Sequence, residues 1–122
     1  YLRLLQTWKT HHPDWKHILW TDEKVAQLKL INQQAYDGAK NFGMKSDILR
    51  LELLYHIGGV YVDVDQECIA PHDVFHHITD LYLGIINETQ FEIANGVIGA
   101  KGGNLFLKEC LKIKLIYIYI LT

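Results

Sequence analysis

A helix, a glycine pair and an alternating strand that ends in two aspartates follow one another without a break, and this order constrains the fold most. Ser46 is a good N-cap for a helix over residues 47–57, and Gly58-Gly59 ends that helix in the usual C-terminal manner. Residues 60–65 then alternate with period two, which predicts a strand. A well-capped helix that leads directly into an apolar strand indicates an α/β arrangement.

The other segments continue this alternation of helix and strand. Residue spacing predicts helices over 1–10, 21–32 and 105–114, strands over 17–20, 81–86 and 97–100, and an irregular connection over 33–44. Thr21 is the expected N-cap of the second helix, and Asn104 is the expected N-cap of the last one. We therefore predict the α/β fold class, with helices packed on a sheet, in a single domain over residues 1–122.

Composition excludes several classes of function. The 122 residues carry a net charge of −2 and no basic run, so we expect no nucleic-acid partner. The apolar run over 111–121 is short and is interrupted by Lys112 and Lys114, so we expect no membrane span. The chain begins at Tyr1 rather than at Met, and we expect it to be a fragment. Cys68 and Cys110 lack metal-ligand spacing and are expected to be free thiols.

Two carboxylates at the end of the 60–65 strand are the main candidates for chemistry. On such a strand Asp63 and Asp65 share one face, with Cα atoms roughly 6.6 Å apart, and Glu67 extends the row if the strand continues. The two carboxylates repel each other, and a divalent cation such as Mg²⁺ or Mn²⁺ would relieve that repulsion. The plain alternative for an Asp-x-Asp is a pair of solvated loop carboxylates, but the apolar run before the pair argues against it.

The preceding helix adds a second pair of charged residues. Asp47 and Arg50 are three residues apart, so they share a face near the start of the helix. Taken alone, this pair is most simply a surface salt bridge worth a few tenths of a kcal/mol. The full order, Ser46-Asp47-x-x-Arg50, apolar helix, Gly-Gly, aromatic strand and Asp-x-Asp, is far more specific than any one of its parts.

The run 45–65 resembles the sugar-binding region of DXD glycosyltransferases. That family includes fungal-type initiating α-mannosyltransferases, capsular polysaccharide transferases and, more distantly, the large glucosylating bacterial toxins. The flanking stretches 8–23 and 95–100 resemble the family as well, so that the resemblance covers about residues 8–110.

This resemblance implies a GT-A-like fold, in which a nucleotide-sugar-binding sheet has helices on both faces. It also implies a nucleotide-sugar donor, a Mn²⁺ or Mg²⁺ ion and transfer that retains the anomeric configuration. By matching position, Asp65 would ligate the metal, and Asp63 would contact the donor ribose and the shell of the metal. Asp47 and Arg50 would orient the sugar and diphosphate of the donor. Members of the family have a further strand ahead of this region and extend beyond it, so we expect a domain that is incomplete at both ends. The apolar tail 111–121 matches nothing in the family pattern.

Two other interpretations stay open from the residues. An apolar strand that ends in Asp-x-Asp also resembles haloacid-dehalogenase-type phosphohydrolases, although Gln66-Glu67 replaces the small pair that usually follows their motif. An inactive nucleotide-binding fragment is the non-enzymatic alternative. The adjacent histidine pairs, at 11–12 and 76–77, point in different directions on any regular element, so we expect no metal ligation by histidine.

Overall fold

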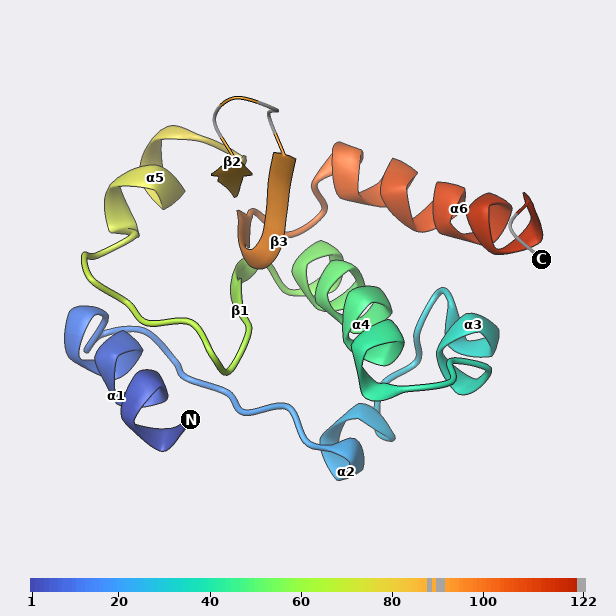
Figure 1. The fold of residues 1–122 in the computed structure, drawn as a ribbon, viewed down its shortest axis with the longest axis horizontal. Coiled ribbons are helices and arrows are strands. Elements are labelled where there is room, and N and C mark those ends of the chain that lie inside the picture. The colour runs from blue at the N-terminus through green and yellow to red at the C-terminus, as the bar shows by residue number, and fades with distance from the viewer. Residues whose placement is uncertain (88, 90–91, 121–122) are drawn as a thin grey trace. The chain divides into compact units, whose positions relative to one another are not determined.

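The computed structural model describes the backbone of residues 1–87, 89 and 92–120, with the side chains of these residues up to Ile113. Figure 1 shows the chain from the blue N-terminal helix to the red C-terminal helix. The elements in this part of the chain follow in the order α1 (Leu2–His11), α2 (Asp22–Val25), α3 (Gln33–Asp37), α4 (Phe42–His56), β1 (Gly59–Val62), α5 (Asp73–Ile78), β2 (Leu81–Asn87), β3 (Glu92–Ala100) and α6 (Leu105–Ile120).

The chain divides into two compact units, each built from two separate segments. The sheet unit consists of Tyr1–Leu19 and Gly59–Lys101, and it holds α1, α5 and the three strands. The helical unit consists of Trp20–Gly58 and the residues from Gly102 onward, and it holds α2, α3, α4 and α6.

The sheet unit contains a small antiparallel sheet with the strand order β1-β3-β2. β3 pairs with β1 from Gly59↔Ala100 to Val62↔Val97, and it pairs with β2 from Leu81↔Ala100 onward. α5 packs on β2 and β3, and Ile98 is almost fully buried. The predicted α/β class is confirmed. The common carboxyl edge of parallel strands, where open α/β sheets bind ligands, has no counterpart in this antiparallel sheet.

The ring of Tyr82 on β2 lies directly over Gly99 on β3. These two residues are register partners, and a Cβ built at position 99 would overlap Cζ of Tyr82. Glycine at 99 is therefore what lets the ring occupy this place.

The helical unit is organised around α4. The side chain of Asn41 caps this helix by accepting a hydrogen bond from the backbone N–H of Met44. Gly58 follows its C-terminus with a φ of 76°, and its N–H donates to the carbonyl of Leu54 at 3.0 Å. The predicted Gly-Gly stop is therefore confirmed, because only glycine adopts this backbone conformation without strain.

A buried carboxylate connects α4 to the segment before α3. Glu52 is fully buried, and its two oxygens accept hydrogen bonds from the N–H groups of Ile31 at 3.0 Å and Asn32 at 2.7 Å. The imidazole Nε2 of His56 lies 3.3 Å from the same carboxylate. The amide of Asn32 in turn donates to the carbonyl of Leu111 on α6 at 3.0 Å. These bonds hold an irregular segment against two helices of the unit.

Several predicted boundaries are wrong. Residues 17–20 form no strand, and the predicted helix over 21–32 is a single turn, α2. The expected irregular connection over 33–44 contains α3 and the first turn of α4, so Asn41 and not Ser46 is the N-cap. The helices predicted over 1–10 and 105–114 are confirmed, as is the strand over 81–86, while the predicted strand at 97–100 is the C-terminal half of β3.

The C-terminal apolar run continues α6 as far as Ile120. Asn104 caps this helix, as predicted, by accepting a hydrogen bond from the N–H of Leu107 at 3.1 Å. Within the described part of the chain, no helix combines the length and the apolar character that crossing a membrane requires. Cys68 and Cys110 are both free thiols.

Candidate functional site

The two aspartates of the Asp-x-Asp motif lie on a turn and not on a strand. β1 ends at Val62, and the N–H of Asp63 makes a last bond to the carbonyl of Gly96 at 2.8 Å. The N–H of Gln66 then donates to the carbonyl of Asp63 at 3.1 Å, which closes a turn over residues 63–66. The prediction that Asp63 and Asp65 project from one strand face is therefore wrong, because the chain turns as soon as its pairing with β3 ends.

Asp63 is held firmly at the start of this turn. The hydroxyl of Tyr61 donates to Oδ1 of Asp63 at 2.6 Å, so these two residues do share a face as the alternation predicted. Gly96 lies under the carboxylate, and a Cβ at that position would lie 3.2 Å from Oδ2 of Asp63 and 3.5 Å from Nε2 of Gln66. Glycine at 96 thus leaves room for both polar groups. Sequence analysis identified neither this role of Gly96 nor the bond from Tyr61.

Asp65 is exposed, and its environment differs from that of Asp63. Its Oδ1 accepts a bond from Nε2 of Gln66 at 3.3 Å, which is long for a hydrogen bond to a carboxylate. Glu67 is exposed and lies beyond the turn, so it does not extend a row of carboxylates. The turn therefore presents one anchored and one accessible carboxylate.

The oxygen chemistry of these two carboxylates is compatible with a hard divalent cation. Among the residues that the structure describes, no group of three or more His, Cys, Asp or Glu side chains is arranged to hold a metal. Mg²⁺ and similar ions are commonly held by one or two carboxylates together with phosphate oxygens and water. The donor set of Asp63 and Asp65 has the oxygen chemistry that such an ion prefers, without forming a closed cage.

Helix α1 holds the chain that leaves the turn. The indole N–H of Trp8 donates to the carbonyl of Gln66 at 2.9 Å, and the hydroxyl of Thr7 accepts from the N–H of Cys68 at 2.8 Å. Sequence analysis predicted a helix over 1–10 but did not identify this bond. The signal that it missed is the indole N–H, since a buried tryptophan needs a hydrogen-bond acceptor.

Asp47 and Arg50 form the ion pair that their spacing predicts. Nη2 of Arg50 lies 3.1 Å from Oδ1 of Asp47, and Arg50 also donates from Nε to the carbonyl of Ser46 and from Nη2 to its hydroxyl, both at 3.2 Å. The side chain of Arg50 is only 6% exposed, against 46% for Asp47. The interpretation as a plain surface bridge is therefore wrong for Arg50. Both residues belong to the helical unit, whereas the Asp-x-Asp turn belongs to the sheet unit.

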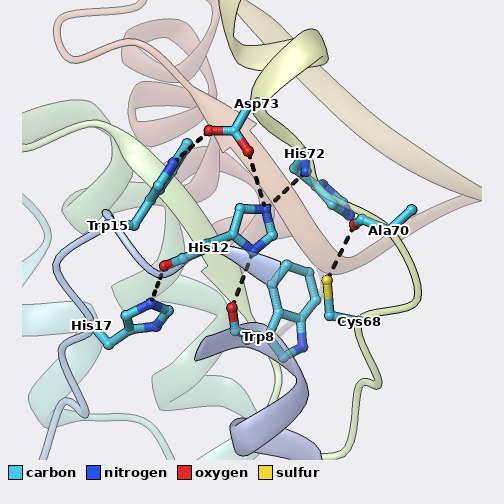
Figure 2. A network of polar contacts seen from close by, with 8 residues as sticks. All are labelled: Trp8, His12, Trp15, His17, Cys68, Ala70, His72 and Asp73. Atoms are coloured by element: carbon cyan, nitrogen blue, oxygen red, sulfur yellow. Dashed lines mark hydrogen bonds and ion pairs between the residues drawn. The ribbon is translucent and has the colours of Figure 1, made fainter. Parts of the chain in front are cut away.

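A cluster of aromatic rings and histidines in the sheet unit, which the sequence did not reveal, is centred on His12 (Figure 2). Nε2 of this buried histidine accepts a hydrogen bond from the backbone N–H of His72 at 2.8 Å, so Nε2 carries no proton. Nδ1 must then carry the hydrogen, and it donates to the carbonyl of Trp8 at 3.2 Å. The carboxylate of Asp73 lies 4.0 Å from Nε2 of His12 and accepts from the indole N–H of Trp15 at 2.8 Å.

Burial alters the titration of several groups in this cluster. The pKa values of His72 and His76 are lowered, chiefly by burial, while the bond from Trp15 lowers the pKa of Asp73. Burial, with a smaller effect of Asp73, raises the pKa of Tyr82 to about 12. Among the described residues, Nδ1 of His72, Nδ1 of His76 and the hydroxyl of Tyr82 are buried without a hydrogen-bond partner.

Sequence comparison assigns the chain to a family that is defined by a region of glycosyltransferases. Residues 2–82, about two thirds of the chain, match the family model of the glycosyltransferase sugar-binding region containing the DXD motif. The chain therefore belongs to this family, and the resemblance of residues 45–65 is confirmed. Membership favours the glycosyltransferase interpretation of the Asp-x-Asp turn over the phosphohydrolase one.

Curated relatives include fungal and bacterial proteins. The chain is 28% identical to inositol phosphoceramide mannosyltransferase 3 of Schizosaccharomyces pombe over 88% of its own length and 35% of the relative. It is 35% identical to the initiation-specific alpha-1,6-mannosyltransferase of Candida albicans over 60% of its length and 21% of the relative. Subversion of eukaryotic traffic protein A of Legionella pneumophila is 28% identical over 57% of the chain and 15% of the relative. The chain thus spans about a third or less of the length of these proteins. No solved structure gives a significant match.

Proposed function

We propose that this chain is the donor-binding part of a metal-dependent glycosyltransferase with a GT-A-like fold. In this proposal the enzyme moves a sugar from a nucleotide-sugar to a glycan or another acceptor and retains the anomeric configuration. Mannose is the favoured sugar, because the fungal relatives are named as mannosyltransferases. The observation that carries the proposal is the turn at 63–66, which presents two carboxylates of unlike environment in a chain that belongs to the DXD family.

The two carboxylates would have different roles. Asp65, which is accessible, would ligate Mn²⁺ or Mg²⁺, and Asp63 would contact the donor ribose and the shell of the ion. The ion would neutralise the negative charge that develops on the departing diphosphate. The bond from Tyr61 fixes one oxygen of Asp63 before any ligand arrives, which lowers the reorganisation that binding requires.

Arg50 and Asp47 would orient the donor. The guanidinium of Arg50 is planar and already held by Ser46 and Asp47, so it could contact a sugar or diphosphate oxygen without first losing much rotational freedom. Asp47 is half exposed and could accept from a sugar hydroxyl. A lysine at position 50 has the charge but not the planar set of donors.

Metal binding with and without a nucleoside diphosphate tests the proposal. We expect the chain to bind Mn²⁺ more tightly when ADP, GDP or UDP is present, because phosphate oxygens complete the coordination shell. Asp65→Asn should weaken that binding at least about tenfold, or about 1.4 kcal/mol, and should change the free energy of unfolding by less than about 0.5 kcal/mol, because the side chain is exposed.

A matched variant separates the site from general charge. Asp14→Asn removes an exposed aspartate from the same sheet unit and should leave Mn²⁺ affinity unchanged. Isothermal titration calorimetry measures the affinities, and urea unfolding measures stability. Equal Mn²⁺ affinity for the wild type and Asp65→Asn would remove Asp65 from the metal site.

A further inference from the structure

The last residue of the Asp-x-Asp turn, Gln66, is held by the side chain of Trp8, which lies 58 residues earlier in the sequence. At its first residue the turn is anchored to β3 by the bond from Asp63 N–H to Gly96. At its last residue, the carbonyl of Gln66 accepts from the indole of Trp8 on α1 at 2.9 Å. Asp65 lies between these anchors, next to Gln66, and the amide of Gln66 also donates to it. Gln66 is thus both the chain neighbour of Asp65 and its hydrogen-bond donor, so any shift of Gln66 also displaces Asp65.

Trp8 is itself held in place by the histidine cluster. Its side chain is only 7% exposed, and its ring stacks on His12 with centroids 5.7 Å apart and an interplanar angle of 13°. The ring of His72 lies against it at a centroid distance of 5.1 Å, and the carbonyl of Trp8 accepts from Nδ1 of His12 (Figure 2). These contacts hold the ring in the orientation in which its N–H donates to the carbonyl of Gln66.

We infer that Trp8 is a positioning residue for the metal-binding pair, because its indole N–H fixes the Gln66 end of the turn and thereby the position of Asp65. This inference rests on the proposed function, in which Asp63 and Asp65 hold the ion. Trp8 is not a ligand of the ion. Its effect reaches the site through the backbone of Gln66, and the neighbouring bond from Cys68 N–H to Thr7 supports the same segment.

Two tryptophans of this cluster allow a matched test. Trp8→Phe keeps an aromatic ring in the buried position and removes the donor to Gln66. Trp15→Phe makes the same chemical change in the same unit and removes the donor to Asp73 instead. Each variant loses one hydrogen bond, so the free energy of unfolding, measured with urea, should fall by a similar amount in both. A purely structural role for Trp8 predicts that the two variants behave alike in every measurement.

The two variants should differ in metal binding. With ADP, GDP or UDP present, we expect the Kd for Mn²⁺ of the 122-residue chain to rise at least about fivefold, or about 1 kcal/mol, in Trp8→Phe. In Trp15→Phe the Kd should stay within about twofold of the wild type, because the indole N–H of Trp15 bonds to Asp73 and not to the turn. An unchanged Kd in Trp8→Phe, with the wild type binding normally, overturns the inference and leaves the proposed function intact. Absence of Mn²⁺ binding by the wild type refutes the proposed function and the inference with it.

A measurement on the wild type keeps the inference testable if Trp8→Phe does not fold. The three indole N–H resonances can be assigned by comparison with Trp15→Phe and Trp20→Phe. Addition of Mg²⁺ with the nucleoside diphosphate should slow solvent exchange of the Trp8 indole proton at least about threefold, because the ligand orders the turn that this proton holds. The Trp15 indole proton should not respond. Equal responses of the two protons would count against a positioning role for Trp8.

Discussion

At the scale of single residues, the structure distinguishes side chains that the sequence treats as equivalent. Asp63 and Asp65 are two aspartates with one residue between them, yet Asp63 accepts a hydrogen bond from the hydroxyl of Tyr61 while Asp65 is exposed. The alternation of residues 60–65 correctly predicted that Tyr61 and Asp63 share a face. It could not predict the turn after Val62, because β1 ends where its pairing with β3 ends, and that partner lies more than 30 residues further along the chain.

Arg50 provides a second test of the candidate site at this scale. Arg50→Lys should lower the affinity for nucleotide-sugars at least about tenfold, because an ammonium cannot reproduce a planar fork. It should also lower the free energy of unfolding by about 1 kcal/mol, since the bonds to Ser46 are made by a buried side chain. The other arginine, Arg3, is exposed, and Arg3→Lys is the matched control that should change neither quantity. Calorimetry with UDP- and GDP-linked sugars, together with urea unfolding, measures both. Unchanged donor affinity in Arg50→Lys would restrict Arg50 to a role in folding.

At the scale of elements, local signals predicted the starts of α1, α2 and α6 and the end of α4, but they missed the start of α4 and the ends of α2 and α6. Gly58 ends α4 because its positive φ is a property of the residue itself. The start of α4 was predicted at Ser46, but Asn41 is also a capping residue and lies five residues earlier. Propensity alone does not choose between two good caps. Beyond α2, the N–H groups of Ile31 and Asn32 bond to the carboxylate of Glu52, some 20 residues away, so these two residues do not continue a helix.

The cluster that joins α1 to α5 should make the sheet unit sensitive to acid. Burial lowers the pKa values of His72 and His76 below their ordinary 6.5, although the nearby Asp73 carboxylate partly offsets this. The unfolded chain therefore binds more protons than the folded chain just below pH 6.5, and the free energy of unfolding should fall as the pH falls through that window. His77 and Lys101 also face His76, and their positive charges lower its pKa further, because they disfavour a second positive charge nearby.

Urea unfolding at about pH 7.5 and about pH 5 measures this effect. Stability should be lower at the acid value, and the double variant His72→Phe/His76→Phe should show a smaller difference between the two. Asp73 adds no loss in this range, because its pKa is lowered from 3.8 and its contribution disappears only at more acid pH. A wild type that is equally stable at both values would contradict the prediction.

At the scale of the whole molecule, the chain order of the elements hides how they pack. Each unit combines an early segment with a late one, so neighbours such as Trp8 and Gln66 are separated by 58 residues. The α/β class, the helices α1, α4 and α6 and the motif itself could be predicted from local pattern. The antiparallel order β1-β3-β2, the anchors of the turn and the histidine cluster could not, because each depends on contacts between distant residues.

The share of the relatives that the chain covers sets an expectation for activity. The chain matches 35% of the length of the Schizosaccharomyces pombe relative, so most of that protein has no counterpart in these residues. We expect the 122-residue chain to bind Mn²⁺ with a nucleoside diphosphate but to transfer no sugar to an acceptor. Chromatographic assay of UDP- and GDP-linked sugars would detect transfer or hydrolysis, with Asp63→Asn/Asp65→Asn as the control. Robust transfer by the chain would show that these residues hold the complete acceptor site.

The ring of Tyr82 over Gly99 has a consequence for how this sequence can evolve. A Cβ at position 99 would overlap the tyrosine ring, so Gly99→Ala forces that ring to move. A small residue at position 82 removes this conflict. The effect of a substitution at either position therefore depends on the residue at the other, so that the same mutation at 99 costs more before the ring at 82 is lost than after it.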